Sequence, residues 1–259
     1  MATRLKSLFQ GQRSALLLKA LAFAFALFAA ERLGGGISIT ILFLGVASIL
    51  FATPFTNARS YAVSFAVLII LSLLFGAHFP QHPFFVAAAA AIIFYCLIGL
   101  KNRYVISRDR LHYFAVLALS FGAFFLFFAS DRSILFTIKA FLLFMVSFFL
   151  WREFFMRYRS SEIPPLSSSG EEHAREAPQG MKNLSASAAA VISLAAVEIA
   201  WAASLTSLSV VNAATLTLLV VFVLADVARR VSDASLSRRT ILSEISIFTL
   251  LTIAIFALN

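Results

Sequence analysis

Two charged residues, Lys139 and Glu198, lie inside long apolar stretches of the sequence and are its strongest candidates for chemistry. A charged side chain at the centre of a membrane helix costs about 2.5–3.5 kcal/mol on insertion scales, so each of them needs a partner or a function. At about 1.5 Å of rise per residue, Lys139 lies about 8 Å and Glu198 about 12 Å from the same edge of their stretches. Opposite charges at similar depth on consecutive helices predict a buried ion pair, whose role is either structural or functional.

Two further side chains, Trp201 and Asn212, fall close to Glu198 in the sequence. Trp201 shares a helix side with Glu198, because residues three positions apart are neighbours on a helix surface. Asn212 lies near the start of the next apolar stretch. The sequence therefore predicts a buried polar site of Lys139, Glu198, Trp201 and Asn212, either as a satisfied contact between helices or as the wall of a cavity.

Small residues recur at every fourth position of the stretch that contains Glu198. One series lies nearly opposite Glu198 and a second precedes it: Ala196, Ala200 and Ser204, and Ser185, Ala189 and Ser193. Such spacing lets another helix approach closely. It predicts a tight helix contact, and a homo- or hetero-oligomer through this small-residue face is one use of it.

Sequence motifs of enzymes and cofactor sites are absent. The chain has no H-E-x-x-H, G-x-G-D, P-loop or dinucleotide-binding glycine pattern, and no G-x-S-x-G with a plausible histidine partner. His78 and His82 are four residues apart, but Pro80 and Pro83 would break a helix that aligned them, and no third metal ligand adjoins them. We expect no catalytic residue, no metal site and no cofactor.

The composition indicates a membrane protein. Of the 259 residues, 61% are hydrophobic and 13% are charged, and the mean hydropathy is +0.94. A soluble domain of this length needs a larger charged surface. The net charge of +9 does not indicate nucleic-acid binding, because the basic residues flank apolar runs instead of forming a stripe with aromatic residues.

Nine apolar stretches are long enough to cross a bilayer as helices. A hydrocarbon core of about 30 Å needs about 20 mostly apolar residues in a helix. Continuous rather than alternating apolar runs favour helices over a barrel. The predicted fold is an all-α polytopic transmembrane helical bundle with spans near residues 14–30, 37–53, 61–78, 84–100, 111–130, 134–151, 184–206, 210–228 and 241–258.

Basic residues between the stretches set the orientation. If the spans alternate in direction, seventeen Lys and Arg residues fall on one side, while Arg32 and Arg132 lie in loops on the other. The positive-inside rule then places the N-terminus inside the cell and the C-terminus outside, in the inner (plasma) membrane. Alternatively, the first stretch is a signal peptide cleaved near Ala24-Phe25-Ala26, although Lys19 interrupts its apolar core.

Other ionisable residues lie near the ends of stretches and are expected at the membrane interface. Lys19 can extend its side chain to the cytoplasmic edge. Asp226 is close in sequence to Arg229 and Arg230, and Glu244 lies in the first turn of the last stretch. We expect both acidic residues to form interfacial ion pairs.

One long polar segment, 152–183, divides the chain. It contains Pro164-Pro165 and a run of serines ending at Gly170, which is typical of a flexible linker. The predicted organisation is a six-span region at 1–151, a cytoplasmic linker at 152–183 and a three-span region at 184–259. The linker is either a passive tether or a docking site for a partner.

The C-terminal third carries a distinctive series of polar residues. Glu198, Trp201 and Ser204-Leu205 share one helix, Asp226 and Arg230 close the next, and Arg239 and Glu244 open the last. This pattern resembles uncharacterised multi-pass inner-membrane proteins of bacteria with reduced genomes. The resemblance implies a bacterial inner-membrane location and carries no activity.

Three functions fit these observations. The first is a transport-type helical bundle with a cavity between the sixth and eighth spans, although the spans lack the Gly and Pro interruptions of broken transporter helices. The second is a non-catalytic membrane scaffold or assembly subunit, and the third a small lipid-modifying membrane enzyme. The expected partners are the lipid bilayer and an oligomer, without nucleic acid.

Overall fold

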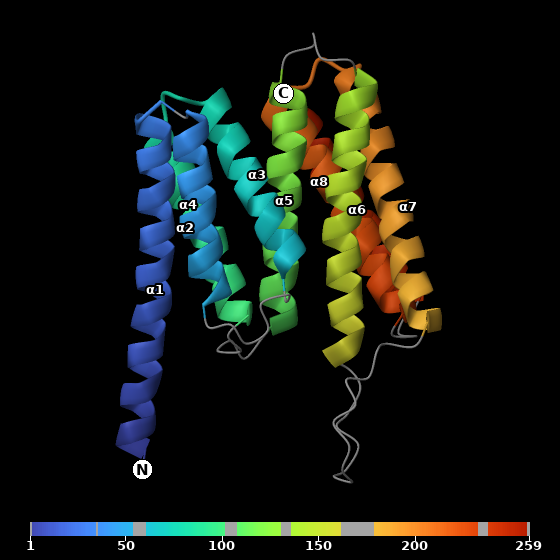
Figure 1. The fold of residues 1–259 in the computed structure, drawn as a ribbon. Helices are drawn as coiled ribbons and strands as arrows, with labels where there is room; N and C mark the ends of the chain where they lie inside the picture. The colour runs from blue at the N-terminus through green and yellow to red at the C-terminus, as the bar shows by residue number, and fades with distance from the viewer. Residues whose placement is uncertain are drawn as a thin grey trace. The chain divides into compact units, whose positions relative to one another are not determined.

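The computed structural model describes residues 2–34, 36–53, 61–101, 108–130, 136–161, 179–232 and 238–257. These residues form nine helices and no strand (Figure 1). Each predicted apolar stretch coincides with one helix, which confirms the all-α fold. The helices are α1 (Ala2–Arg32), α2 (Ile37–Ala52), α3 (Ala62–His78), α4 (Pro83–Lys101), α5 (Arg108–Ala129), α6 (Phe136–Ser161), α7 (Gln179–Ser204), α8 (Val210–Ser232) and α9 (Arg238–Ala257).

Five helices of the described chain are long and apolar enough to cross a membrane by length and composition. They correspond to Ser14–Arg32, Pro83–Lys101, Arg110–Ala129, Ser185–Ser204 and Val210–Val231. Helices α2 and α3, and the segment Phe248–Ala257 of α9, are shorter apolar stretches. In α6, the longest run without a charged residue lies between Lys139 and Arg152.

The chain divides into two compact units, Met1–Leu119 and Ser120–Asn259, with the boundary inside α5. The second unit therefore groups α6 with α7, α8 and α9, whereas the sequence suggested a division after residue 151. Helix α6 also continues to Ser161, ten residues into the predicted linker, because Phe154 and Phe155 are buried along it. Residues 162–178 of that linker lie outside the described residues.

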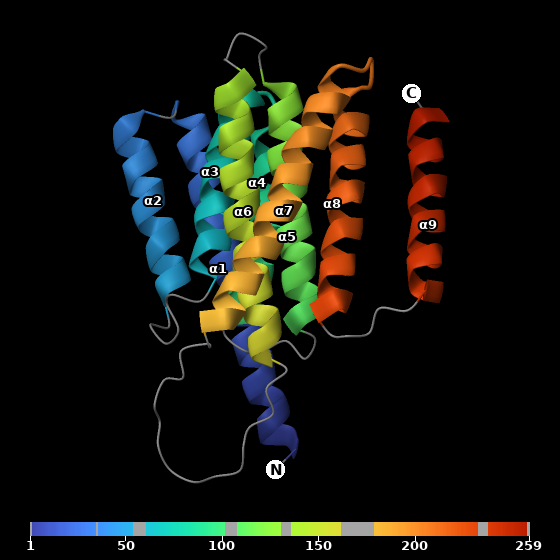
Figure 2. The same cartoon turned by 90° about the vertical axis from the view of Figure 1, so that its right-hand side faces the viewer.

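Aromatic rings join the helices of the first unit. Helix α1 packs along α4 and α2, and α3 packs along α4 (Figures 1 and 2). Phe23 of α1 stacks on Phe94 of α4 with ring centroids 4.2 Å apart, and both side chains are fully buried. Phe43 of α2 and Phe65 of α3 extend this cluster, at 5.6 Å from Phe23 and 5.9 Å from Phe94. One aromatic core thus holds four helices.

Two lysines from neighbouring helices converge on the C-terminal end of α2. Lys19 of α1 donates hydrogen bonds to Thr53 O (2.6 Å) and Thr53 Oγ1 (3.1 Å). Lys101 of α4, only 3% exposed, donates to Phe51 O, and its ammonium lies 4.7 Å from the centre of the Phe51 ring. The last carbonyls of a helix lack partners within the helix and carry partial negative charge, so both ammonium groups stabilise this end.

Large and small side chains face each other in the second unit. Helix α7 packs along α6 and along α8, and α9 packs on α8. The small residues of α7 are buried, including Ala189, Ser193, Ala196 and Ala200. Helix α6 supplies large buried side chains such as Trp151. Small residues on one helix let the other come close, as their spacing predicted.

Candidate ligand pocket

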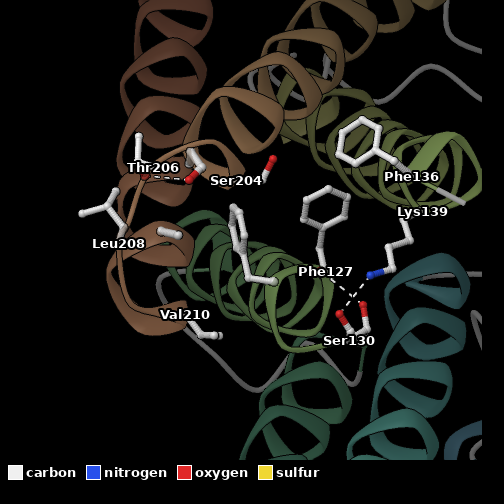
Figure 3. A pocket seen from close by; sticks show the side chains of 11 residues that line it. Phe127, Ser130, Phe136, Lys139, Ser204, Thr206, Leu208 and Val210 are labelled. Atoms are coloured by element: carbon white, nitrogen blue, oxygen red, sulfur yellow. Dashed lines mark hydrogen bonds between the residues drawn. The ribbon is translucent and has the colours of Figure 1, made fainter. Parts of the chain in front are cut away.

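A pocket of about 350 Å³ lies within the second unit, where four helices end or begin (Figure 3). The C-terminal end of α5, the first turn of α6, the end of α7 and the start of α8 form its walls. The lining residues are Phe127, Phe128, Ser130, Phe136, Lys139, Ala203, Ser204, Thr206, Leu208, Val210 and Ala213. Helices that alternate in direction bring these four ends to one side.

Lys139 supplies the charge of the pocket. Its side chain is half-buried, and its Nζ donates a hydrogen bond of 2.9 Å to Ser130 O (Figure 3). Ser130 follows the last residue of α5, where its N–H donates to Leu126 O (2.9 Å) and its hydroxyl to Phe127 O (3.1 Å). The carbonyl of Ser130 lies beyond the helix and accepts a bond from outside it. The end of α5 thus positions the Lys139 ammonium at the pocket wall.

Two hydroxyl groups form the opposite wall. Ser204 donates to Trp201 O (2.6 Å) and Thr206 to Ala203 O (2.7 Å), while the Thr206 N–H also donates to Ala203 O (3.1 Å). These bonds close the last turn of α7 and hold both hydroxyl oxygens at the lining. A hydroxyl that donates one hydrogen bond keeps lone pairs that can accept others.

Aromatic rings supply the apolar part of the lining. Phe127 meets Phe136 edge-to-face with ring centroids 5.7 Å apart, and it meets Phe128 in the same way at 5.2 Å. Ligand sites commonly combine apolar walls with a few placed polar groups. An ammonium, two hydroxyls and three phenyl rings suit a small anion that has an apolar body.

The structure brings one of the four predicted site residues into this pocket. Lys139 lines it, whereas Glu198 is exposed on α7 and Trp201 is 53% exposed. In the described part of the chain, no ion pair joins Lys139 to Glu198. Glu198 precedes Ser204 by six residues, about 9 Å along the axis and about 240° around it, so the two side chains leave α7 in different directions.

Asn212 lies close to the pocket without lining it. Its backbone N–H donates to Ser209 Oγ (3.3 Å), and the N–H of Ala213 donates to Ser209 O (2.9 Å). Ser209 therefore caps the N-terminus of α8, a role that serine favours. The neighbours of Asn212 on the lining are Val210 and Ala213.

The small-residue face of α7 is covered within the chain. Ser185, Ala189, Ser193, Ala196 and Ala200 are all buried, and α6 and α8 pack along this helix. The close helix contact predicted from their spacing is confirmed. Because the contact is internal, it explains the spacing without an oligomer.

One predicted ion pair is present. Asp226 accepts hydrogen bonds from Arg229 (2.9 Å) and Arg230 (2.6 Å) at the end of α8, which confirms the ion pair expected for this residue. The side chain of Glu244 lies outside the described residues. Among the residues that the structure describes, no three His, Cys, Asp or Glu side chains gather as a metal site.

Sequence reasoning gave no role to a buried carboxylate in the first unit. Both carboxylate oxygens of Glu31 are buried and have no hydrogen-bond partner among the described residues, and the side chain packs against Gly76 of α3. The sequence signal that could have indicated this contact is Gly76, near the end of an apolar stretch. A glycine within a helix commonly marks the close approach of another part of the chain.

Comparison with known proteins gives no relative. No protein-family model, no curated protein and no solved structure matches the chain.

Proposed function

We propose that the chain is an integral protein of a bacterial inner membrane. In this proposal the pocket lined by Lys139, called the Lys139 pocket below, binds a small anion with an apolar body. In this proposal all nine helices span the bilayer, with the N-terminus inside and the C-terminus outside. The pocket then opens on the outer side, and the protein acts as a transport-type helical bundle.

Helix composition and loop charge support the membrane part of the proposal. Five helices of the described chain are long and apolar enough to span. In α6, Lys139 and Arg152 bound the apolar run, and long basic side chains can extend from such positions to the interface. With nine spans, the basic residues divide seventeen to two between the loops of the two sides, as the positive-inside rule requires.

The Lys139 ammonium carries the ligand part of the proposal. It lines a pocket of about 350 Å³, a volume within the usual range of small-molecule sites, and the same pocket exposes aromatic and hydroxyl groups. A positive charge in a partly apolar cavity attracts an anion more strongly than it would in water, because the local dielectric constant is lower.

Ligand-dependent thermal stability tests the pocket. Purified protein in detergent is heated with a series of carboxylates, including benzoate, and with benzyl alcohol as an uncharged ligand of similar shape. We expect benzoate or a larger aromatic carboxylate to raise the Tm of the wild type, with no rise from benzyl alcohol or in Lys139→Met. Ser204→Ala, which keeps the charge, is the matched control and should retain most of the rise.

One result of this experiment would refute the proposed anion site. If no carboxylate stabilises the wild type more than Lys139→Met, the pocket does not bind anions through Lys139. The membrane part of the proposal would be unaffected, because it depends on other residues.

Cysteine labelling in intact cells tests the topology. In a Cys96→Ser background, Gln81→Cys lies in the turn between α3 and α4, on the proposed outer side. Val231→Cys lies at the end of α8, on the proposed inner side. A membrane-impermeant maleimide should label Gln81→Cys directly and Val231→Cys only after the cells are opened. The reverse pattern would invert the orientation, and labelling of both in intact cells would contradict the alternation.

A scaffold or assembly role is the second candidate. The exposed carboxylate of Glu198 on α7 favours it, because a membrane helix with an exposed charge requires a partner.

A further inference from the structure

A long groove lies between α1 and α4 in the first unit. It has a volume of about 620 Å³, and six residues of each helix line it, from Leu17 to Phe28 on α1 and from Phe84 to Tyr95 on α4. On both helices the lining residues follow one another at steps of three, one, three, one and three residues. Residues at these steps share one side of a helix, so the groove runs lengthwise between the two helices. We call it the α1–α4 groove.

The sizes of the side chains explain the shape of the α1–α4 groove. Its floor is formed by small residues: Ala20, Ala24, Ala87, Ala88 and Ala91. Ala20 and Ala87 are almost completely buried, because alanines let the two helices approach closely. Large side chains stand beside this floor, such as Phe25 and Phe84, which are 73% and 69% exposed. The groove is therefore open to the medium that surrounds the protein.

The lining of the α1–α4 groove suits a hydrocarbon chain. All of its side chains are hydrocarbon except Tyr95, whose hydroxyl lies at one end. Eleven helical residues separate the two ends of the lining on each helix, which gives a length of about 17 Å. One leaflet contributes half of a hydrocarbon core of about 30 Å. The length of the groove thus matches the depth of one leaflet.

A positive charge lies at the end of the groove where α1 ends and α4 begins. The Cζ atom of Arg32 lies 5.5 Å from the centre of the Phe28 ring, the last lining residue on α1. The Arg32 side chain is exposed and has no hydrogen bond or ion pair among the described residues. The adjacent Glu31 packs against Gly76 of α3. The guanidinium therefore keeps all its donors available, in the planar arrangement that binds phosphate.

We propose that the α1–α4 groove binds one acyl chain of an acidic phospholipid, with the lipid phosphate on Arg32. The charge selects this occupant. A neutral hydrocarbon chain or an apolar helix in the groove leaves the guanidinium without an acceptor, whereas a phospholipid fills the groove and supplies one. In phosphatidylglycerol the phosphate keeps its net charge, while in phosphatidylethanolamine the ammonium of the headgroup compensates it. Arg32 therefore favours phosphatidylglycerol.

This inference rests on the membrane part of the proposed function and is independent of the Lys139 pocket. With the proposed topology, Arg32 lies at the outer surface and the phospholipid comes from the outer leaflet. Lipid binding in detergent does not depend on orientation. An inverted topology would assign the phospholipid to the inner leaflet, while failure of lipid binding would leave the topology untouched.

Retention of phospholipid by the purified full chain tests the headgroup contact. Native mass spectrometry in a neutral detergent measures binding of phosphatidylglycerol and phosphatidylethanolamine with identical acyl chains. We expect the wild type to retain one phosphatidylglycerol in preference to phosphatidylethanolamine. Arg32→Gln should weaken phosphatidylglycerol binding about ten-fold and abolish the preference, since it removes a charged hydrogen bond. Arg110→Gln is the matched control, because Arg110 is an exposed arginine of the same unit outside the groove. It should bind as the wild type does.

Filling the groove tests the acyl-chain contact. Ala88→Phe places a ring on the floor and should weaken the binding of both phospholipids. Ala89→Phe, at the next residue, is exposed outside the groove and should have no effect. The Tm of each variant without lipid reports whether it folds. Phosphatidylglycerol with a photoreactive diazirine in its acyl chain gives a readout on the wild type. In vesicles it should label α1 and α4 between Leu17 and Phe28 and between Phe84 and Tyr95.

Three results would overturn the proposal. The first is equal binding of phosphatidylglycerol by the wild type and Arg32→Gln, which would leave only neutral hydrocarbon in the groove. The second is photolabelling spread evenly over all the helices, which would mean bulk lipid without a site. The third is an attachment of Phe25→Cys to another protein by disulfide formation in native membranes, which would assign the groove to a helix of a partner.

Discussion

The carboxylate of Glu31 lies against the α-carbon of Gly76, at the point where α1 and α3 approach each other. A methyl group at position 76 would overlap the carboxylate of Glu31, so the contact depends on the absence of a side chain there. Both oxygens of Glu31 are enclosed without a hydrogen-bond partner in the described residues. The close approach of two helices thus encloses a polar group that is expensive to bury.

Gly76→Ala should destabilise the first unit by less than a typical overpacking substitution. The added methyl group forces only the flexible end of the Glu31 side chain to move, and the helix propensity of alanine, about 1 kcal/mol better than that of glycine, offsets part of the cost of about 1–3 kcal/mol that rigid overpacking carries. The measurement is thermal unfolding of the purified protein in detergent. Gly45→Ala is the matched control, because no atom lies within 4 Å of the added methyl group there and alanine favours a helix.

The double variant Glu31→Ala/Gly76→Ala should recover stability relative to Gly76→Ala, because it removes the overlapping group. A double variant no more stable than Gly76→Ala would show that the alanine acts through something other than Glu31.

Ala200→Leu should disrupt the packing of α7. Ala200 is fully buried on the small-residue face, and a leucine there would push α7 away from its neighbours at a cost of about 1–3 kcal/mol. Ala202→Leu, two residues further and exposed, should be almost neutral. Denaturation in detergent compares the two variants. Equal Tm values for both would mean that the small residues are not required for the helix contact.

Lys19→Met and Lys101→Met should each weaken the attachment of α2. Each substitution removes a charged donor from the carbonyls at the end of this helix, and bonds to charged groups contribute about 1.5–3 kcal/mol. The desolvation of a buried ammonium offsets part of that contribution, so a loss of about 1 kcal/mol is expected for each variant. Arg32→Met, at an exposed position, controls for the loss of a positive charge. Limited proteolysis near residue 53 gives a local readout, and unchanged cleavage in both variants would contradict this role.

Asp226→Asn should have a small and salt-dependent effect. The two arginines that bind Asp226 are about one-third exposed, although the Asp226 side chain itself is only 11% exposed, and ion pairs with exposed partners contribute about 0.2–1 kcal/mol. The wild type should lose that difference as salt rises, because ions screen exposed charges. Tm values in 50 mM and 1 M salt provide the check, and a difference that does not shrink would show that the Asp226 pairs are not screened.

The helices could be predicted from the sequence because each depends on one local property, an apolar run that ends at charged or turn-forming residues. The Asp226 pair could be predicted for a similar reason, since Arg229 and Arg230 follow it by one helical turn. These inferences need only helix geometry, and the structure confirms them.

The pocket could be predicted only in part, because depth along a helix does not fix direction around it. Lys139 and Glu198 lie at similar distances from the ends of their apolar stretches. However, the Glu198 side chain points in a different direction from the Ser204 side chain, which lines the pocket at the end of α7. The carbonyl of Ser130, which binds Lys139, becomes an acceptor because α5 stops one residue earlier. Such backbone acceptors have no sequence signature. The contacts of Lys19 and Lys101 with the carbonyls at the end of α2 could not be predicted for the same reason.

The end of α2 also bears on the thickness of the bilayer around the protein. Sixteen residues give this helix a length of about 24 Å, less than the hydrocarbon core of about 30 Å. If α2 spans the bilayer as proposed, its last carbonyls would end below the surface of an average bilayer, where water is scarce. Lys19 and Lys101 would then bring ammonium groups to that depth, and a helix too short to reach water would be solvated by its neighbours. A short helix with its own donors needs neither a steep tilt nor a thinned membrane to remain in place.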